Sequence, residues 1–296
     1  MLTRIISGAV GVALMIVVFI FHDTIFLPIA VAVMIAVMLY ELLRVVKLNT
    51  NIPILCAVEA CGISMPFIYE RFHYLPKGVV GGADFSRMSG SPTRLAFVVT
   101  LAAAFIIFLT WLNKHKEIRY EQVFFTLAVM VFVPQAMSTM VRIDRYSIHH
   151  GLILLILGLC GAWIADTGAY FTGVALGKHK LCPEISPKKT IEGFVGGIVI
   201  TGLVFVGVSL LYNKKIAEVP VPMEPYEYAL MGLAGCLCAV IGTIGDLSAS
   251  MVKRQTGIKD YGKIMPGHGG LMDRFDSVLF VLPTFYAFVT LTGVFR

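Results

Sequence analysis

Charged residues are scarce in this chain of 296 residues, since Asp, Glu, Lys and Arg make up only 14% of it. A soluble domain carries about 25% charged residues. Hydrophobic residues reach 57%, and a membrane-spanning helix needs about 20 of them in succession. The composition excludes a separate soluble domain. It predicts an all-α, polytopic integral membrane protein with about nine transmembrane helices. The apolar runs lie near residues 5–21, 25–40, 52–69, 95–112, 123–141, 151–175, 193–212, 228–250 and 277–295.

Cysteine pairs with metal-ligand spacing are also missing. The chain has six cysteines and no C-x-x-C motif, and only Cys182 falls outside an apolar run. We therefore interpret the cysteines as small core residues rather than as metal ligands. Tandem repeats and low-complexity tracts are missing too, which excludes a repeat architecture.

The basic residues are unevenly distributed between alternate loops. Fifteen Lys and Arg residues fall on one side of the expected spans and nine on the other. The positive-inside rule then places the N-terminus and the long basic loops in the cytoplasm. The loop near residues 70–94 departs from this pattern, because it carries four basic residues on the predicted outer side. The run near 5–21 lacks a clear small-residue cleavage site, so we expect a retained helix.

Residues 1–150 consist of hydrophobic spans and ordinary loops, and predict a scaffold with possible roles in dimer or lipid contact. Residues 151–296 carry three polar clusters and predict the catalytic region. Glu59 is the exception in the first half, because a charge inside a span costs several kcal/mol unless it is paired or wet. It indicates a structural partner or polar cavity, with a direct catalytic role as the alternative.

The first cluster is Asp166-Thr-Gly-Ala-Tyr170, at the end of an apolar run. Its glycines, and Gly173 and Gly177 beyond it, suit close helix packing. Asp166 either caps a helix or faces a functional polar cavity.

The second cluster runs from Ile185 to Gly193. Ser186 and Thr190 suit capping of the next helix, and Lys188 and Lys189 lie near its start. Cations there oppose the helix dipole unless an anion lies between them. A bound phosphate would resolve that conflict, whereas the alternative is two lysines that only set topology.

The third cluster runs from Gly245 to Asp276. If the eighth helix continues, a carboxylate, a hydroxyl and two cations share one of its faces; these are Asp246, Ser250, Lys253 and Arg254. The glycines after Pro266 give a backbone that can approach an anion closely.

Two carboxylates end this cluster. Asp273 and Asp276 are three residues apart and would project together from a helix. With Asp246 they could cage one or two divalent ions through oxygen. His268 is either a hydrogen-bonded loop residue or a general acid or phosphate contact.

These residues resemble the signature of the phosphatidate cytidylyltransferases. That signature reads S-x-(aliphatic)-K-R-x4-K-D-x-(small)-x2-(L/I/F)-(P/G)-x-H-G-G-(aliphatic)-x-D-R-(apolar)-D, and the chain follows it from Ser250 to Asp276. Met265 replaces the usual Leu, Ile or Phe, a substitution of similar volume. The Asp166–Gly193 region is similar to the family's D-(S/T)-(G/A)-A-Y and S-P-x-K-T-x-x-G stretches. Val174 stands where the family often has a cation.

The resemblance implies a multi-pass membrane enzyme, often a homodimer. It would convert CTP and phosphatidate into CDP-diacylglycerol and pyrophosphate with Mg²⁺, and a second cation, monovalent or divalent, stays open. We expect the enzyme in a bacterial inner membrane with its site facing the cytoplasm. Nucleic acid is not an expected partner. Metal ligation falls to Asp246, Asp273 and Asp276, and catalytic roles fall to Asp246, Asp273, Lys259 and His268. Substrate binding falls to Ser186, Lys188, Lys189, Ser250, Lys253, Arg254, Gly269, Gly270 and Arg274.

Three other functions can be compared with this one. A dolichol- or phytol-type kinase would use similar groups but transfer the γ-phosphoryl group and release CDP. A transporter could place Glu59, Asp166 and Asp246 in helices for ion coupling, yet needs no dense cationic loop. A purely structural membrane protein explains the spans but none of the three clusters.

Overall fold

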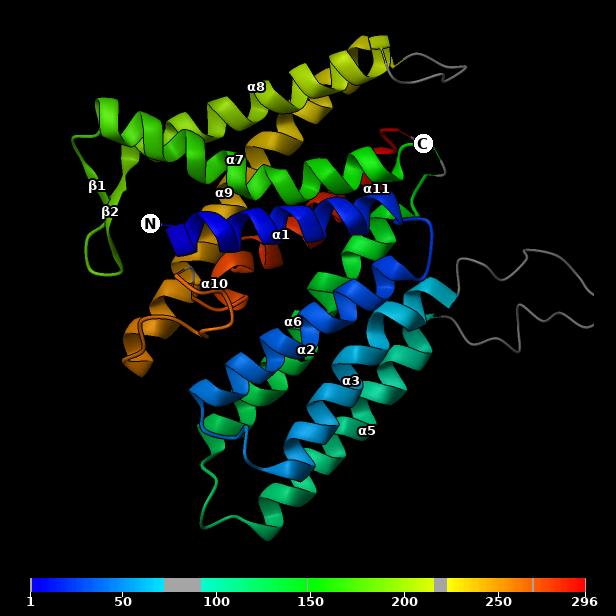
Figure 1. Ribbon diagram of the computed structural model, residues 1–296, viewed down its shortest axis with the longest axis vertical. Coiled ribbons are helices and arrows are strands. Elements are labelled where there is room, and N and C mark those ends of the chain that lie inside the picture. The colour runs from blue at the N-terminus through cyan, green and yellow to red at the C-terminus, as the bar shows by residue number, and fades with distance from the viewer. Residues whose placement is uncertain (1, 72–91, 148, 216–222, 268, 296) are drawn as a thin grey trace, which may run out of the picture. The chain divides into compact units, whose positions relative to one another are not determined.

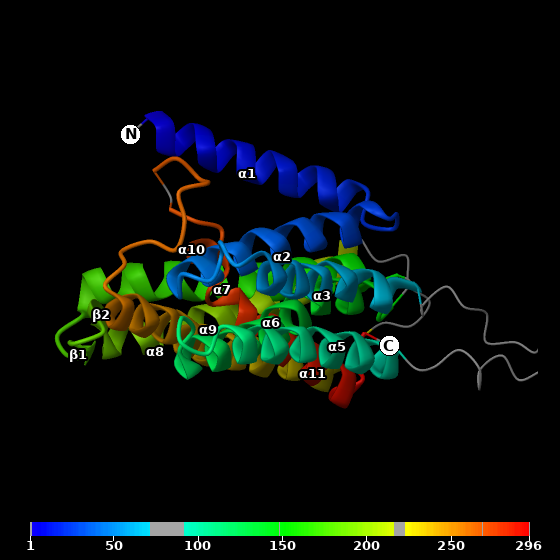
Figure 2. The ribbon, with the colours of Figure 1, turned by 90° about the horizontal axis from the view of Figure 1, so that it is seen from below.

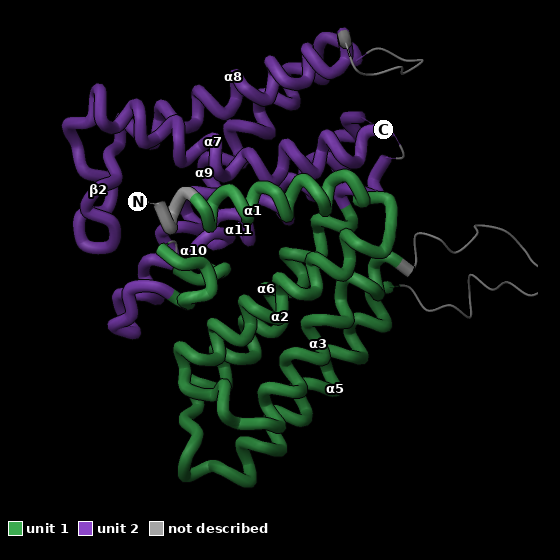
Figure 3. The backbone as a smooth tube through the Cα atoms, in the orientation of Figure 1, with its two compact units in different colours: residues 1–142, 261–272 green, residues 143–260, 273–296 purple. Residues whose placement is uncertain are grey.

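The computed structural model describes residues 2–71, 92–147, 149–215, 223–267 and 269–295. The chain forms two compact units (Figure 3). Unit 1 comprises residues 1–142 and 261–272, and unit 2 comprises residues 143–260 and 273–296. The chain therefore passes from unit 2 into unit 1 after Asp260 and returns at Asp273. The expected division near residue 150 separates a scaffold from a catalytic region. The two compact units do not test that division, so it stays a prediction.

Unit 1 is a bundle of long apolar helices. They are α1 (Leu2–Ile20), α2 (Phe26–Val45), α3 (Ile52–Arg71), α5 (Pro92–Asn113) and α6 (Tyr120–Asp144). Figures 1 and 2 show α2, α3 and α5 running side by side, with α3 packed against both neighbours. The buried stripe of α2 repeats at helical spacing, through Leu27, Val31, Ile35, Leu39 and Leu42.

Unit 2 combines helices with one small hairpin. Its elements are α7 (Gly151–Leu176), β1 (Lys180–Cys182), β2 (Ser186–Thr190), α8 (Ile191–Lys215), α9 (Pro225–Thr256), α10 (Met272–Phe275) and α11 (Val278–Thr292). Helix α8 packs against both α7 and α9, and α11 packs against α9. Small residues permit the close α7–α8 approach, since a Cβ on Gly193 would lie 2.6 Å from the carbonyl oxygen of Ala169.

Eight helices of the described residues are long and apolar enough to cross a membrane. The remaining expected span, residues 5–21, corresponds to α1, whose apolar stretch Ile6–Ile20 is shorter. The prediction of an α-helical polytopic integral membrane protein is confirmed. All six cysteines are free. Cys61 and Cys238 are buried as expected, but Cys56 is exposed, so the core assignment is wrong for that residue.

Helix α9 is the element that carries the third cluster. It continues for 32 residues, well beyond the 20 or so that a span requires. It ends at Gly257, whose left-handed φ of +69° suits a glycine cap. Ser250 and Lys253 therefore lie on the same helix as Asp246, as the sequence predicts.

Candidate active site

A hairpin, rather than a plain loop, presents the two lysines of the second cluster. Strands β1 and β2 pair antiparallel, with Lys180 opposite Thr190. Thr190 Oγ1 accepts the N–H of Gly193 at 3.1 Å, which confirms the predicted cap of α8. Lys188 and Lys189 lie on β2, before the helix starts. The sequence did not predict this hairpin, because the stretch contains no alternating apolar pattern.

Glu192 fixes the base of the hairpin to α8. Its Oε2 accepts the backbone N–H groups of Lys178 and His179 at 3.0 and 3.2 Å. Its Oε1 lies 2.6 Å from Nδ1 of His179. The first turn of α8 thus holds the strand that precedes the lysines.

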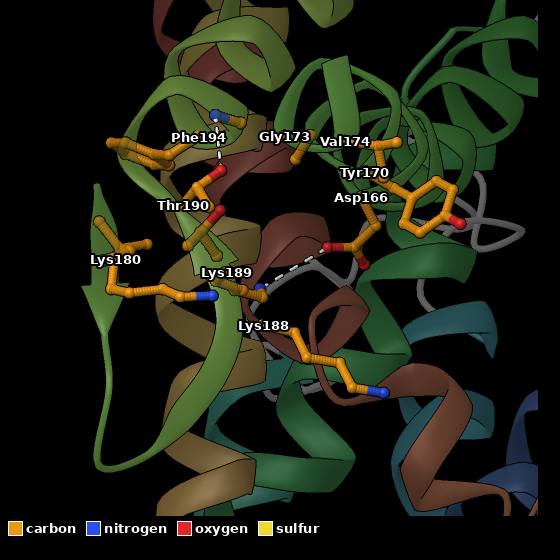
Figure 4. A pocket seen from close by; sticks show the side chains of 13 residues that line it. Asp166, Tyr170, Gly173, Val174, Lys180, Lys188, Lys189, Thr190 and Phe194 are labelled. Atoms are coloured by element: carbon orange, nitrogen blue, oxygen red, sulfur yellow. Dashed lines mark hydrogen bonds and ion pairs between the residues drawn. The ribbon is translucent and has the colours of Figure 1, made fainter. Parts of the chain in front are cut away.

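Lys189 bridges two carboxylates that come from different helices. Its Nζ lies 2.6 Å from Oδ2 of Asp246 on α9 and 3.8 Å from Oδ1 of Asp166 on α7. The lysine side chain is 23% exposed, so this pairing is partly shielded from solvent. Figure 4 shows Lys189 facing Asp166. Three segments distant in the sequence therefore meet at one charged cluster.

The two carboxylates at the end of the third cluster share Lys253 as a charged neighbour. Asp273 lies on α10 and Asp276 lies in the turn between α10 and α11. Both carboxylates interact with Lys253, which agrees with the expectation that they project together. Oδ1 of Asp273 pairs with Nζ of Lys253 at 3.0 Å. Asp276 accepts the N–H of Ser277 and interacts electrostatically with Asp246, Lys253 and Asp166.

The chemistry of this cluster fits a divalent cation. Four carboxylates (Asp166, Asp246, Asp273 and Asp276) and two ammonium groups (Lys189 and Lys253) leave a formal charge of −2. Carboxylate oxygen is the ligand that Mg²⁺ prefers. Within the described residues, no three of these carboxylates bring ligand atoms within 4.8 Å of one another. Lys189 lies between Asp166 and Asp246 and pairs with both.

Two pockets adjoin the cluster. The first, of about 420 Å³, is lined by residues of α7, the hairpin, α8 and α9 (Figure 4). Its charged lining comes from Asp166, Lys180, Lys188 and Lys189. The second, of about 570 Å³, lies at the end of α9. Four expected binding or catalytic residues line it, namely Ser250, Lys253, Arg254 and Lys259.

The remaining predicted residues have varied surroundings. Ser186 opens β2, and Arg254 donates from Nε to the carbonyl of Ile185 in the hairpin turn at 3.4 Å. Arg274 lies exposed on α10. Gly269 and Gly270 belong to unit 1, where Gly269 has a φ of +86° that favours glycine. His268 lies outside the described residues.

Sequence reasoning missed Glu41 and Arg44 of α2. Both bind the glycine-rich loop, residues 261–272. Glu41 accepts two of its N–H groups and Arg44 donates to the carbonyl of Tyr261. An acid and a base three residues apart at the end of an apolar run were the available signal.

An α-helical membrane fold whose spans gather carboxylates and lysines defines an integral membrane protein with a charged polar site. The chain belongs to the cytidylyltransferase family, whose sequence profile matches residues 2–292. This confirms the predicted family, and with it the enzyme class, a CTP-dependent nucleotidyltransferase.

Relatives named phosphatidate cytidylyltransferase occur in several bacteria. That of Bacillus subtilis (strain 168) is 40% identical over 194 residues, covering 66% of this chain and 68% of the relative. That of Staphylococcus aureus (strain COL) is 35% identical over 183 residues, covering 62% and 65%. That of Staphylococcus saprophyticus is 42% identical over 133 residues, covering 45% and 47%. The last two alignments thus span less than two thirds of the relatives' lengths.

Proposed function

We propose that this chain transfers the cytidylyl group of CTP to phosphatidate, forming CDP-diacylglycerol and pyrophosphate in phospholipid synthesis. The family and the names of the relatives support this reaction. The observation that carries it is the position of Lys189, between Asp166 and Asp246. This position joins the three clusters that resemble the family's motifs.

The reaction needs alignment more than acid–base chemistry. An oxygen of the lipid phosphate attacks the α-phosphorus of CTP, and the bond from that phosphorus to the β-bridging oxygen breaks. Pyrophosphate leaves with the bond's electron pair. The lipid phosphate is already a nucleophile, so no activated side chain is required. Neutralising and orienting two polyanions then dominates the rate.

The two pockets suit the two substrates differently. Tyr170 and Val174 line the first pocket and are exposed on the apolar surface of α7. A lipid can therefore enter this pocket sideways, with its phosphate near Lys180 and Lys188. Serine and cations line the second pocket, which suits the triphosphate of CTP. We assign phosphatidate to the first pocket and CTP to the second.

Mg²⁺ belongs to the same proposal. Asp246 and Asp276 would hold it, with Asp273 nearby in sequence. Bound there, it would supply positive charge to the phosphates of CTP. Lys253 and Lys189 would neutralise the remaining charge. We also place the site at the cytoplasmic face of a bacterial inner membrane, because CTP is a cytoplasmic metabolite. The family resemblance adds the proposal of a homodimer.

Labelled CTP tests the reaction directly. Purified protein in detergent receives phosphatidate, a long-chain alcohol lipid, Mg²⁺ and CTP carrying ³²P in either the α or the γ position. Cytidylyl transfer puts the α label into lipid and the γ label into pyrophosphate. A lipid kinase would put the γ label into lipid and release CDP. Label in neither product would contradict both reactions and favour a transporter.

A further inference from the structure

We propose that Glu41 of α2 is a positioning residue for cytidylyl transfer, and this rests on the function proposed above. Its carboxylate holds the glycine-rich loop, residues 261–272, in the conformation that leads into Asp273. The first half of the chain then contributes to the reaction and is more than a scaffold.

Both oxygens of Glu41 bind backbone N–H groups of the loop. Oε1 accepts the N–H of Leu271 at 3.1 Å, and Oε2 accepts the N–H of Met272 at 2.8 Å. Glu41 is only 2% exposed. A hydrogen bond to an ionised acceptor is about twice as strong as a neutral one, and burial keeps water from competing for the two N–H groups.

Two glycines let the carboxylate reach the backbone of the loop. A Cβ built on Gly262 or on Gly270 would collide with Oε1 of Glu41. The same two glycines also approach each other closely. The carboxylate therefore lies directly against both ends of the loop. This gives a physical reason for glycine at both positions.

Neighbouring side chains fix the loop at two more points. Arg44, one helical turn from Glu41, donates from Nη2 to the carbonyl of Tyr261 at 2.7 Å. Ser7 of α1 donates to the carbonyl of Pro266 at 3.1 Å. Tyr261 is itself 1% exposed. The loop is thus held at its start, its middle and its end by α1 and α2.

The end held by Glu41 leads straight to a predicted catalytic residue. Met272, whose N–H binds Oε2, is joined by a peptide bond to Asp273. The direction in which the chain leaves Met272 sets where the Asp273 side chain begins. Asp273 in turn pairs with Lys253. Loosening the hold of Glu41 should therefore affect turnover rather than phosphatidate binding.

Three variants test this role. Glu41→Gln keeps the shape but puts an amide NH₂ where one N–H needs an acceptor. Glu41→Asp keeps the charge but is one methylene shorter. Glu121→Gln is the control, because Glu121 is an exposed acid in the first turn of α6, another helix of unit 1. Each is assayed for kcat, for both KM values and for hydrogen exchange of residues 261–272.

We expect Glu41→Gln to lower kcat by about 10- to 100-fold, as loss of a supporting hydrogen bond does elsewhere. KM for phosphatidate should stay close to the wild-type value, because neither Glu41 nor the loop lines the pocket assigned to that substrate. Exchange of the Leu271 and Met272 amides should quicken while exchange in α9 does not. Glu41→Asp should lie between Glu41→Gln and wild type, and Glu121→Gln should match wild type in both measurements.

A folded Glu41→Gln protein with normal kcat, or with unchanged exchange in the loop, would overturn the proposal. Equal effects from Glu121→Gln would do the same, because they would indicate a general sensitivity to losing an acidic charge in unit 1. If Glu41→Gln does not fold, the same comparison on Glu41→Asp decides. Absence of CDP-diacylglycerol from the wild-type protein would instead refute the proposed function, while the exchange measurement would still test the hold on the loop.

Discussion

Lys189 and Lys188 are neighbours in sequence, yet the structure gives them different surroundings. Lys189 is paired with Asp246 and Asp166, whereas Lys188 is exposed in the lining of the first pocket. If both lysines served only to set the membrane topology, their surroundings would not need to differ. The proposed site gives Lys189 a part in charge organisation and Lys188 a part in binding phosphate.

Replacing each lysine with glutamine separates these roles. Lys189→Gln leaves Asp166 and Asp246 facing each other without their cation, so we expect kcat to fall by about 100-fold or more. Lys188→Gln removes one charge-assisted contact, so we expect KM for phosphatidate to rise by about tenfold or more with kcat kept. Steady-state kinetics in mixed micelles measures both constants. Identical profiles for the two variants would contradict the assignment.

At the scale of elements, the contact between α7 and α8 places Asp166 opposite the hairpin. Gly193 lies where α8 contacts α7, and a Cβ there would lie 2.6 Å from the carbonyl oxygen of Ala169. Gly207, also on α8, has nothing within 4 Å of a built Cβ. The two glycines form a matched pair for testing this packing.

We expect Gly193→Ala to destabilise the protein by about 1–3 kcal/mol through overpacking and to lower activity by displacing Lys189. Gly207→Ala should be neutral or stabilising by up to about 1 kcal/mol, since alanine favours a helix. Thermal unfolding in detergent and turnover measure the two effects. Equal stability of the two variants would show that the close approach is not required.

A second element-scale feature is the junction before α7, where His150 is buried. Its Nδ1 lies 3.1 Å from the Tyr212 hydroxyl, and that hydroxyl donates to the carbonyl of His149. Burial, and then the neighbouring His149, lower the pKa of His150 below its usual 6.5. The folded protein therefore favours the neutral ring.

Because the unfolded chain binds the proton more readily, His150 stabilises the fold above about pH 6.5. That stability is lost as the pH falls through the lowered pKa of the folded protein. We expect the unfolding temperature to drop between pH 6.5 and pH 5, and to drop less in His150→Gln. The same acid sensitivity in both proteins would assign the effect to other groups.

The sequence predicted those elements whose signals are local. The continuation of α9 follows from an apolar run that leads into charges at helical spacing, and the Thr190 cap follows from residue type. The pairing of Asp273 with Lys253 could not be predicted, because the two residues are 20 positions apart and a loop without helical spacing lies between them. Glu41 was missed because its partners are backbone N–H groups 230 and 231 residues away. The spacing of residues along a helix or strand does not indicate a contact with such a distant part of the chain.

At the scale of the whole molecule, the orientation in the membrane decides how CTP reaches the site. The 15-to-9 distribution of basic residues predicts that the hairpin and the glycine-rich loop face the cytoplasm. Lys180 and Lys263 are both exposed. Single cysteines at these positions, in a background without native cysteines, should react with a membrane-impermeant thiol reagent only in inverted vesicles. Labelling from outside intact cells would contradict the predicted orientation.

The charged cluster around Asp246 is the proposed site of cytidylyl transfer. The most direct measurement is single-turnover formation of CDP-diacylglycerol by Asp246→Asn, with saturating CTP, phosphatidate and Mg²⁺. Glu117→Gln is the control, because Glu117 is an exposed surface acid. We expect Asp246→Asn to fold normally and to lose at least about 10³-fold in the rate of CDP-diacylglycerol formation. Glu117→Gln should keep the wild-type rate. Near-normal turnover by a folded Asp246→Asn protein would contradict the proposed site.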